Sequence, residues 1–226
     1  MPQAGVHAIV GVASRKWMPK KEWLLLGIVL GNLVPDLDNI AVAVATVTKS
    51  STEGLHRTFT HSIFTILAIA LLFYLISLAT KNARWGNFGV GLGIGILLHV
   101  LLDLLLWFNG VELFWPIRYE LNFWSWFVMP NWLGILLKTA EFLAFGLYFS
   151  LLASMAGRQK TNEDYVPKLR GWANIQFALF LLFTVLFFFP QAGVDTIYGA
   201  LYLLALFFSI GVTLRMMQTV EQPINQ

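Results

Sequence analysis

Long apolar stretches separated by short polar ones dominate this chain. A helix rises about 1.5 Å per residue, so about 20 apolar residues cross a hydrocarbon core of about 30 Å. Such stretches cover residues 23–48, 62–80, 86–108, 133–156, 172–189 and 194–217. The pattern predicts an all-α fold, a polytopic membrane bundle of about five to six spans.

The first of these stretches is interrupted by polar residues and a proline. Asn32, Pro35, Asp36 and Asp38 all fall inside it. Proline removes a backbone donor and disfavours helix at the residue before it, so we expect this N-terminal span to be broken at Pro35. Irregular backbone at membrane depth is tolerated where it is buried in protein or lines a wet cavity.

Two further segments are expected to contact the membrane without crossing it. Residues 4–14 form an apolar stretch of about 16 Å as a helix, which can enter the hydrocarbon core but not span it. Residues 109–131 are rich in tryptophan and phenylalanine, the composition of a segment at a membrane interface. The N-terminus lacks the basic, apolar and small-residue succession of a removable signal peptide.

Composition narrows both the class of protein and the chemistry open to it. Hydrophobic residues make up 58% of the chain and charged residues 12%, and the mean hydropathy is +0.69, as expected for an integral membrane protein. Nothing in this composition favours a nucleic-acid partner. The absence of cysteine excludes disulfides and thiolate metal sites, so a bound metal would need nitrogen and oxygen ligands.

Basic residues predict the orientation. If residues 23–48 cross from inside to outside, eleven lysines and arginines fall on the inner side and three on the outer side. Positive charge favours the cytoplasmic side. We therefore expect a multi-pass inner-membrane protein with a cytoplasmic C-terminus and with the 49–60 loop on the opposite side.

The ionisable residues inside or beside the first spans form the candidate site. All four histidines lie within the first 103 residues, and His99 and Asp103 are one helical turn apart on the same face. Ionisable groups are costly in the membrane unless they are paired, solvated or bound to a cation. The candidate metal ligands are His7, Asp36, Asp38, His56, His61, His99 and Asp103.

These seven candidates exceed the three or four protein ligands of a single catalytic zinc, so two ions, or one ion with an acid/base carboxylate, are both open. Zinc is the favoured divalent ion, with manganese or magnesium as alternatives. Asp36 and Arg57 are the candidate catalytic residues. Arg57 is chosen because a guanidinium matches phosphate geometry and stays charged. Lys138 and Glu141, three residues apart, are expected to form a structural ion pair.

Five ordered motifs carry a resemblance to a known family. They are G-V-H-A-I-V-G (Gly5 to Gly11), L-V-P-D-L-D (Leu33 to Asp38), H-R-T-F-T-H-S (His56 to Ser62), G-I-G-I-L-L-H-V-L-L-D (Gly93 to Asp103) and G-V-E-L-F-W-P (Gly110 to Pro116). Over about its first 120 residues the chain resembles the YdjM-like, LexA-regulated inner-membrane proteins, a family of predicted membrane-bound metal-dependent hydrolases. Two residues depart from the family pattern. Thr58 stands where the family usually has glycine, and Asn39 stands where some members have histidine.

The resemblance implies a metal and hydrolysis. With the residues, it predicts a membrane-bound hydrolase that acts on a lipid or amphiphilic ester, preferably a phosphoester, through a metal-activated water. Two alternatives stay open, an ion-coupled transporter with a midplane site and a membrane protein whose metal only staples its helices. We expect residues 1–132 to form the metal-site domain with its aromatic interfacial loop, and residues 133–226 to add three transmembrane helices. The oligomeric state is not predicted.

Overall fold

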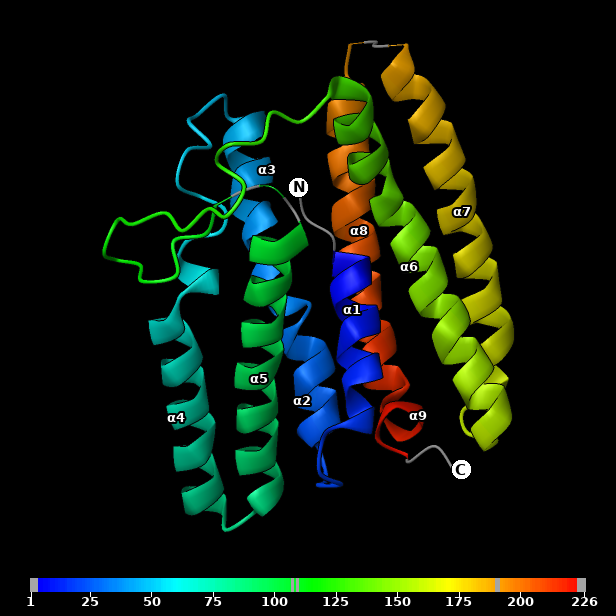
Figure 1. The fold of residues 1–226 in the computed structure, drawn as a ribbon. Coiled ribbons are helices and arrows are strands. Elements are labelled where there is room, and N and C mark those ends of the chain that lie inside the picture. Colours follow the sequence, from blue (N-terminus) through cyan, green and yellow to red (C-terminus); the bar gives the residue numbers. More distant parts are fainter. Residues whose placement is uncertain (1–3, 107, 109, 190–191, 223–226) are drawn as a thin grey trace. The chain divides into compact units, whose positions relative to one another are not determined.

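A computed structural model describes residues 4–106, 108, 110–189 and 192–222 (Figure 1). Asn109, the first residue of the predicted aromatic connection, lies outside them. The chain divides into two compact units, Val10–Val128 and Met1–Ile9 with Met129–Gln226. The expected division after residue 132 lies near this boundary, but the first nine residues group with the C-terminal unit.

Most of the described residues are helical. The elements in chain order are α1 (Ala4–Ala13), η1 (Ser14–Lys16), α2 (Leu24–Gly31), η2 (Val34–Asp38), α3 (Asn39–Val47), η3 (Phe59–His61), α4 (Ile63–Thr80), α5 (Ala83–Leu106), α6 (Asn131–Gln159), η4 (Glu163–Tyr165), α7 (Val166–Phe188), α8 (Val194–Arg215) and α9 (Met217–Glu221). Five helices, α4 to α8, are long and apolar enough to cross a membrane. The predicted all-α polytopic fold is confirmed.

The predicted break in the first span is also present. Helix α2 ends at Gly31, and the segment Val34–Val47 continues at an angle of 42° to it, with Pro35 at the start of the short helix η2. A proline in the first turn needs no backbone donor, so it fits there while ending the preceding helix. Asp36 and Asp38 therefore lie on a turn of 3₁₀ helix between two α-helical halves.

Glycines bring α2 unusually close to α5. A Cβ atom added to Gly31 would lie 2.3 Å from the carbonyl oxygen of Leu92, and one added to Gly95 would lie 2.3 Å from that of Ile28. Gly27 and Gly91 make the equivalent approach one turn earlier. Small residues four apart allow such packing in membranes. We call these four residues, Gly27, Gly31, Gly91 and Gly95, the glycine clasp.

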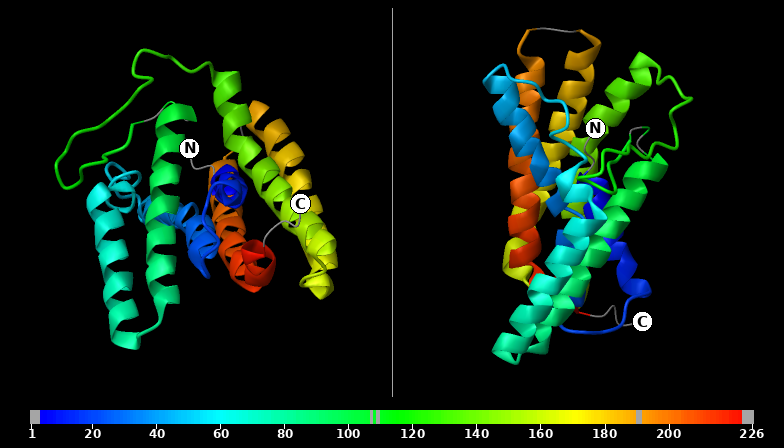
Figure 2. Two further views of the ribbon diagram at one scale, coloured as in Figure 1. Left: turned by 60° about the horizontal axis from the view of Figure 1, so that its bottom comes forward. Right: turned by 90° about the vertical axis from the view of Figure 1, so that its left-hand side faces the viewer.

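Helix α4 lies beside α5 in both views of Figure 2. Ile66 of α4 and Ile96, Val100 and Leu104 of α5 form a buried core that also includes Val111 of the aromatic connection. This core holds the start of the connection against the ends of α4 and α5. It thereby ties residues 110–128 to the elements that carry the candidate site.

The C-terminal unit contains α6 and α7 as an antiparallel pair, packed closely at Gly146 against the ring of Phe177 (Figure 1). The predicted pairing of Lys138 with Glu141 is wrong. Lys138 forms its ion pair with Asp195 of α8, whereas Glu141 accepts a hydrogen bond from the backbone nitrogen of Gly5 at 3.0 Å. Each of the two side chains therefore interacts with a residue of another helix and not with the other.

Candidate metal centre

The site in the Val10–Val128 unit is assembled from three short pieces of the chain. The break after α2 supplies Asp36 and Asp38, the loop ending in η3 supplies His56 and His61, and α5 supplies the remaining pair, His99 and Asp103. The glycine clasp fixes the first piece against the third, because it aligns α2 with the turn of α5 that precedes His99. Buried ionisable groups therefore meet at one end of two closely packed helices.

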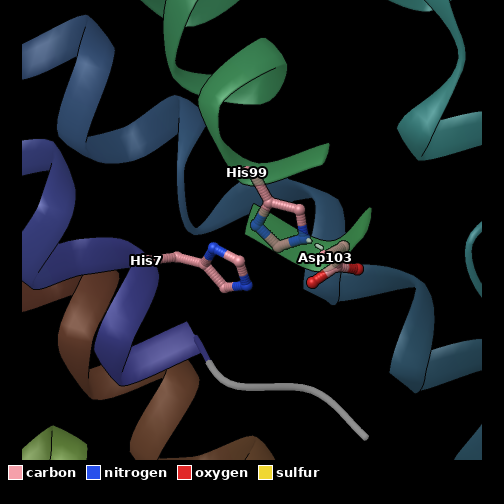
Figure 3. A group of neighbouring side chains, drawn as sticks. All are labelled: His7, His99 and Asp103. Carbon is pink, nitrogen blue, oxygen red and sulfur yellow. Dashed lines mark ion pairs between the residues drawn. The ribbon is translucent and has the colours of Figure 1, made fainter. Parts of the chain in front are cut away.

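His99 is held in one tautomer by the backbone of the broken helix. Its Nδ1 lies 2.9 Å from the carbonyl oxygen of Asn32, an atom that only accepts hydrogen bonds. Nδ1 must therefore carry the proton, and in the neutral ring Nε2 has a free electron pair. Asp103 follows one turn later on the same helix, with Oδ2 3.8 Å from Nε2 of His99 (Figure 3).

His61 is held in the same tautomer by a side-chain relay. The hydroxyl of Thr60 donates to Asp38 Oδ2 at 2.8 Å, so it accepts from Nδ1 of His61 at 2.9 Å. Nε2 of His61 is then also unprotonated. Burial lowers the pKa of His61 well below its usual value, and the neighbouring His99 lowers it further. Both effects favour the neutral imidazole, which is the form that binds metals.

The two free electron pairs face each other. Nε2 of His61 lies 3.1 Å from Nε2 of His99, and these nitrogens lie 3.6 and 3.8 Å from Asp103 Oδ2. Asp36 Oδ1 lies 3.9 Å from Nε2 of His99, and Asp36, His61 and His99 form a buried group whose ligand atoms are all within 4.8 Å of one another. Four acceptor atoms thus converge.

The spacing of these atoms suits a shared ion. Ligand atoms about 2.0 Å from a tetrahedral cation are separated by about 3.3 Å. The separations of 3.1 Å between the two Nε2 atoms and 3.6 Å from Nε2 of His61 to Asp103 Oδ2 lie close to that value, whereas Asp36 Oδ1, at 3.9 Å from Nε2 of His99, would have to move closer. A cation between the atoms would remove the repulsion between their electron pairs, so nitrogen and oxygen donors here fit a divalent metal ion.

Asp38 and His56 show a different geometry. Nδ1 of His56 lies 2.6 Å from Asp38 Oδ1, while Asp38 Oδ2 accepts hydrogen bonds from the backbone nitrogen of Arg57 and the hydroxyl of Thr60. Asp38 is therefore a centre of hydrogen bonds that orders the whole loop. One nitrogen of His56 also lies in a group with carboxylate oxygens of Asp36 and Asp38, all within 4.8 Å.

Arg57 is buried beside the site. Its backbone adopts the left-handed conformation, with φ 62°, held by the hydrogen bond to Asp38 and by one from Glu112 to its carbonyl oxygen. Its Nε lies 2.9 Å from Asp103 Oδ2. Sequence reasoning assigned this guanidinium to an anionic group of the substrate. The structure places one edge of it on a protein carboxylate.

Several contributors escaped the sequence analysis. The carbonyl of Asn32 and the hydroxyl of Thr60 set the two tautomers, and neither group has a signature of its own. The Gly27-x-x-x-Gly31 repeat was a usable signal, since it matches the Gly91-x-x-x-Gly95 repeat that it packs against. His7 lies on α1 in the other unit, and its participation stays a prediction.

Comparison with known families agrees with the motifs. A model of the YdjM inner membrane protein family matches residues 3–193. The chain belongs to the YdjM family. The match continues well beyond the stretch that the five motifs cover and includes helices α6 and α7 as well. No curated protein and no solved structure matches the chain.

Proposed function

We propose that this YdjM-family protein is a metal-dependent hydrolase of the inner membrane. The observation that carries the proposal is the 3.1 Å approach of two Nε2 atoms, each left without a proton by the hydrogen bond at its own Nδ1. Asp36, His61 and His99 would hold the ion, with Asp103 beside them. Zinc fits these donors best, and such an ion supplies the Lewis acidity that activates water and polarises a scissile bond. Three protein ligands are typical of catalytic zinc, which keeps one position open.

The proposed substrate is a membrane lipid or another amphiphilic ester, with a phosphoester preferred. The aromatic connection supports this choice, because it contacts the loop that carries His56 and His61. Ser62 donates to the carbonyl oxygen of Trp115 at 2.8 Å, and the ring of Trp115 meets that of Phe59 at 5.3 Å. Phe123 and Trp126 of the same connection are exposed, as expected for side chains at a lipid interface.

Arg57 remains the proposed contact for an anionic group on that substrate, with Asp103 holding its Nε edge in place. A lysine would keep the charge but lose the planar fork that a phosphate engages. Arg57→Lys should therefore retain the metal and lower phosphoester hydrolysis by about 10-fold, or about 1.4 kcal/mol. Unchanged hydrolysis in a metal-loaded Arg57→Lys protein would remove Arg57 from the proposed catalytic residues.

The proposed orientation places the C-terminus in the cytoplasm and the loop before η3 on the other side, from the eleven-to-three distribution of basic residues. Single cysteines introduced at Ser51 and Lys160 test it, since the native chain has none. A membrane-impermeant thiol reagent added to intact cells should label the first and spare the second. Labelling of both from one side would overturn the assignment.

The function is tested on the purified protein by elemental analysis and by hydrolysis of a phospholipid panel with and without chelator. We expect a bound divalent ion and hydrolysis that the chelator removes. An inactive protein with a stoichiometric, tightly held ion would favour the structural-staple alternative instead. Full hydrolysis without metal would overturn the proposal.

A further inference from the structure

A pocket opens between α7 and α8 of the C-terminal unit, and none of the residues that line it belongs to the candidate metal centre. Its volume of about 380 Å³ lies within the range of about 300 to 1,000 Å³ that is usual for ligand pockets. The side chains around it are apolar apart from one hydroxyl and one indole nitrogen, so it suits an apolar ligand. Its walls include Tyr165 of η4, Trp172 of α7, and Leu204, Phe207, Phe208 and Gly211 of α8.

The pocket exists because α8 lies apart from α7 and because Gly211 has no side chain. Helix α7 packs closely on α6, whereas it touches α8 at few points. A Cβ atom added to Gly211 would meet nothing within 4 Å. Leu204 and Phe207 are 53% and 50% exposed, so the pocket is open along its side. Both helices are long and apolar enough to cross a membrane, and the medium that reaches such an opening is lipid.

Positive charge gathers at the Tyr165 end of the pocket. Lys168 Nζ and Arg215 Cζ each lie 5.5 Å from the ring centre of Tyr165. Arg215 pairs with the exposed Asp164 at 3.1 Å, whereas Lys168 forms no ion pair with any residue that the structure describes. Helix α7 begins at Val166, and the positive end of its dipole adds to these charges. One end of the pocket therefore has a positive charge that the described residues do not neutralise.

This combination of an apolar wall and a cationic end selects the class of ligand. It matches an acyl chain joined to a negatively charged headgroup, because basic pockets between transmembrane helices bind the headgroups of anionic lipids. A helix of a partner protein, about 10 Å across, would cover a pocket of this size without filling it. A zwitterionic lipid would fill the apolar part equally well but would bring no net charge to Lys168.

We propose that this pocket binds an anionic phospholipid. One acyl chain lies along Phe207 and Gly211, and the headgroup phosphate lies beside Lys168 and Arg215. In the orientation proposed above, this end of α7 faces the cytoplasm, so the lipid comes from the cytoplasmic leaflet. The proposal does not depend on the hydrolase function, because the lipid is held here as a ligand and no group of the metal centre takes part.

The headgroup contact is tested by native mass spectrometry. The delipidated protein is exposed to equal amounts of phosphatidylglycerol and phosphatidylethanolamine with the same acyl chains, and the parent should retain phosphatidylglycerol preferentially. Lys168→Gln should reduce that preference about 5-fold, the usual contribution of one basic residue near an anionic membrane surface. Arg170→Gln is the matched control, because Arg170 is also exposed on α7 but makes no cation–π contact with Tyr165 within the described chain.

The acyl-chain contact is tested in the same measurement. Gly211→Leu places a side chain in the pocket and should reduce retention of both lipids on the order of 10-fold, since about two methylene groups of the bound chain lose their apolar contacts. Gly199→Leu is the matched control, because Gly199 is also on α8 with open space around its Cβ but does not line the pocket. Leucine forms helices better than glycine, so neither variant should lower the melting temperature.

Three results would overturn the proposal. They are equal retention of the two lipids by the parent, equal lipid preference in Lys168→Gln and Arg170→Gln, and equal retention by the two leucine variants. A parent that is dimeric without lipid, and monomeric as Gly211→Leu, would assign the pocket to a second copy of this chain and overturn the proposal as well. A parent that retains phosphatidylglycerol as expected but hydrolyses no phospholipid would overturn the proposed hydrolase function alone.

Discussion

Both units of the molecule bury polar side chains among apolar helices, but they satisfy them differently. In the C-terminal unit, two buried pairs of hydroxyl groups satisfy each other: the hydroxyl of Tyr148 meets that of Thr213 at 2.6 Å, and Thr161 meets Thr219 at 2.8 Å. A hydroxyl can both donate and accept, so the two members of such a pair can bond to each other. In the Val10–Val128 unit, the atoms that converge between His61 and His99 are all acceptors.

The difference shows how a binding site in a membrane protein can be told apart from buried polar residues that serve only its structure. A buried ionisable residue is expensive in either unit, and its mere presence marks nothing more than a need for a partner. Glu141, buried in the C-terminal unit, meets that need by accepting a hydrogen bond from the backbone nitrogen of Gly5. The histidine cluster is different because the hydrogen bond at each Nδ1 leaves two proton-free Nε2 atoms facing each other, 3.1 Å apart.

The largest effect is expected from Asp103→Ala. It removes one of the converging acceptors and also takes the carboxylate away from the buried guanidinium of Arg57. Breaking a buried pair costs about 3 to 5 kcal/mol, and bound metal should fall as well. The melting temperature and the metal content of the purified variant measure the two losses separately.

Asp164→Ala is the matched control in the other unit. Asp164 pairs with Arg215 at 3.1 Å, but its side chain is 70% exposed and solvent screens the interaction. The expected loss is at most about 1 kcal/mol, with no change in metal content. Equal losses of stability in Asp103→Ala and Asp164→Ala would mean that the buried and the exposed ion pair contribute the same free energy.

The fold could be predicted from the sequence because the signals that indicate it are local. Pro35 inside an apolar stretch predicts the broken span, and the four-residue spacing of His99 and Asp103 predicts a shared helix face. It could not rank the seven candidate ligands, since His56 and His61 share one motif yet Asp38 contacts the first directly and the second through Thr60. It also paired Lys138 with Glu141 by spacing alone, whereas the actual partner, Asp195, comes from another helix.

An intermediate effect is expected from Gly95→Ala in the glycine clasp. The added methyl group would lie 2.3 Å from the carbonyl oxygen of Ile28, so α2 and α5 must move apart. Overpacking of this kind costs about 1 to 3 kcal/mol, which exceeds the gain of about 1 kcal/mol in helix propensity. Separation should also lengthen the hydrogen bond from His99 to Asn32 and weaken metal binding.

Gly93→Ala provides the comparison on the same helix. Its methyl group would meet Ile66 of α4 at 3.4 Å, an ordinary van der Waals contact. We expect a melting temperature equal to or slightly above that of the parent, and unchanged metal content. A Gly95→Ala protein as stable and as metal-rich as Gly93→Ala would show that close helix approach is not needed to position His99.

The smallest effect is expected from Thr60→Val, which keeps the shape of the side chain and removes the hydroxyl between Asp38 and His61. His61 keeps its ring in place but loses the acceptor that holds the proton on Nδ1, so part of the population should adopt the other tautomer, with Nε2 protonated. Outer-shell partners of this kind are worth about 10- to 100-fold in metal affinity, and we expect the lower end because Asp38 Oδ2 lies only 3.6 Å from Nδ1 of His61 and can take over as acceptor. Titration with Zn²⁺ against a competing chelator measures the change, and Thr46→Val is the control, since Thr46 bonds only to its own helix. An affinity identical in the two valine variants would show that the tautomer of His61 is set without Thr60, and the relay from Asp38 would then have no part in preparing the metal centre.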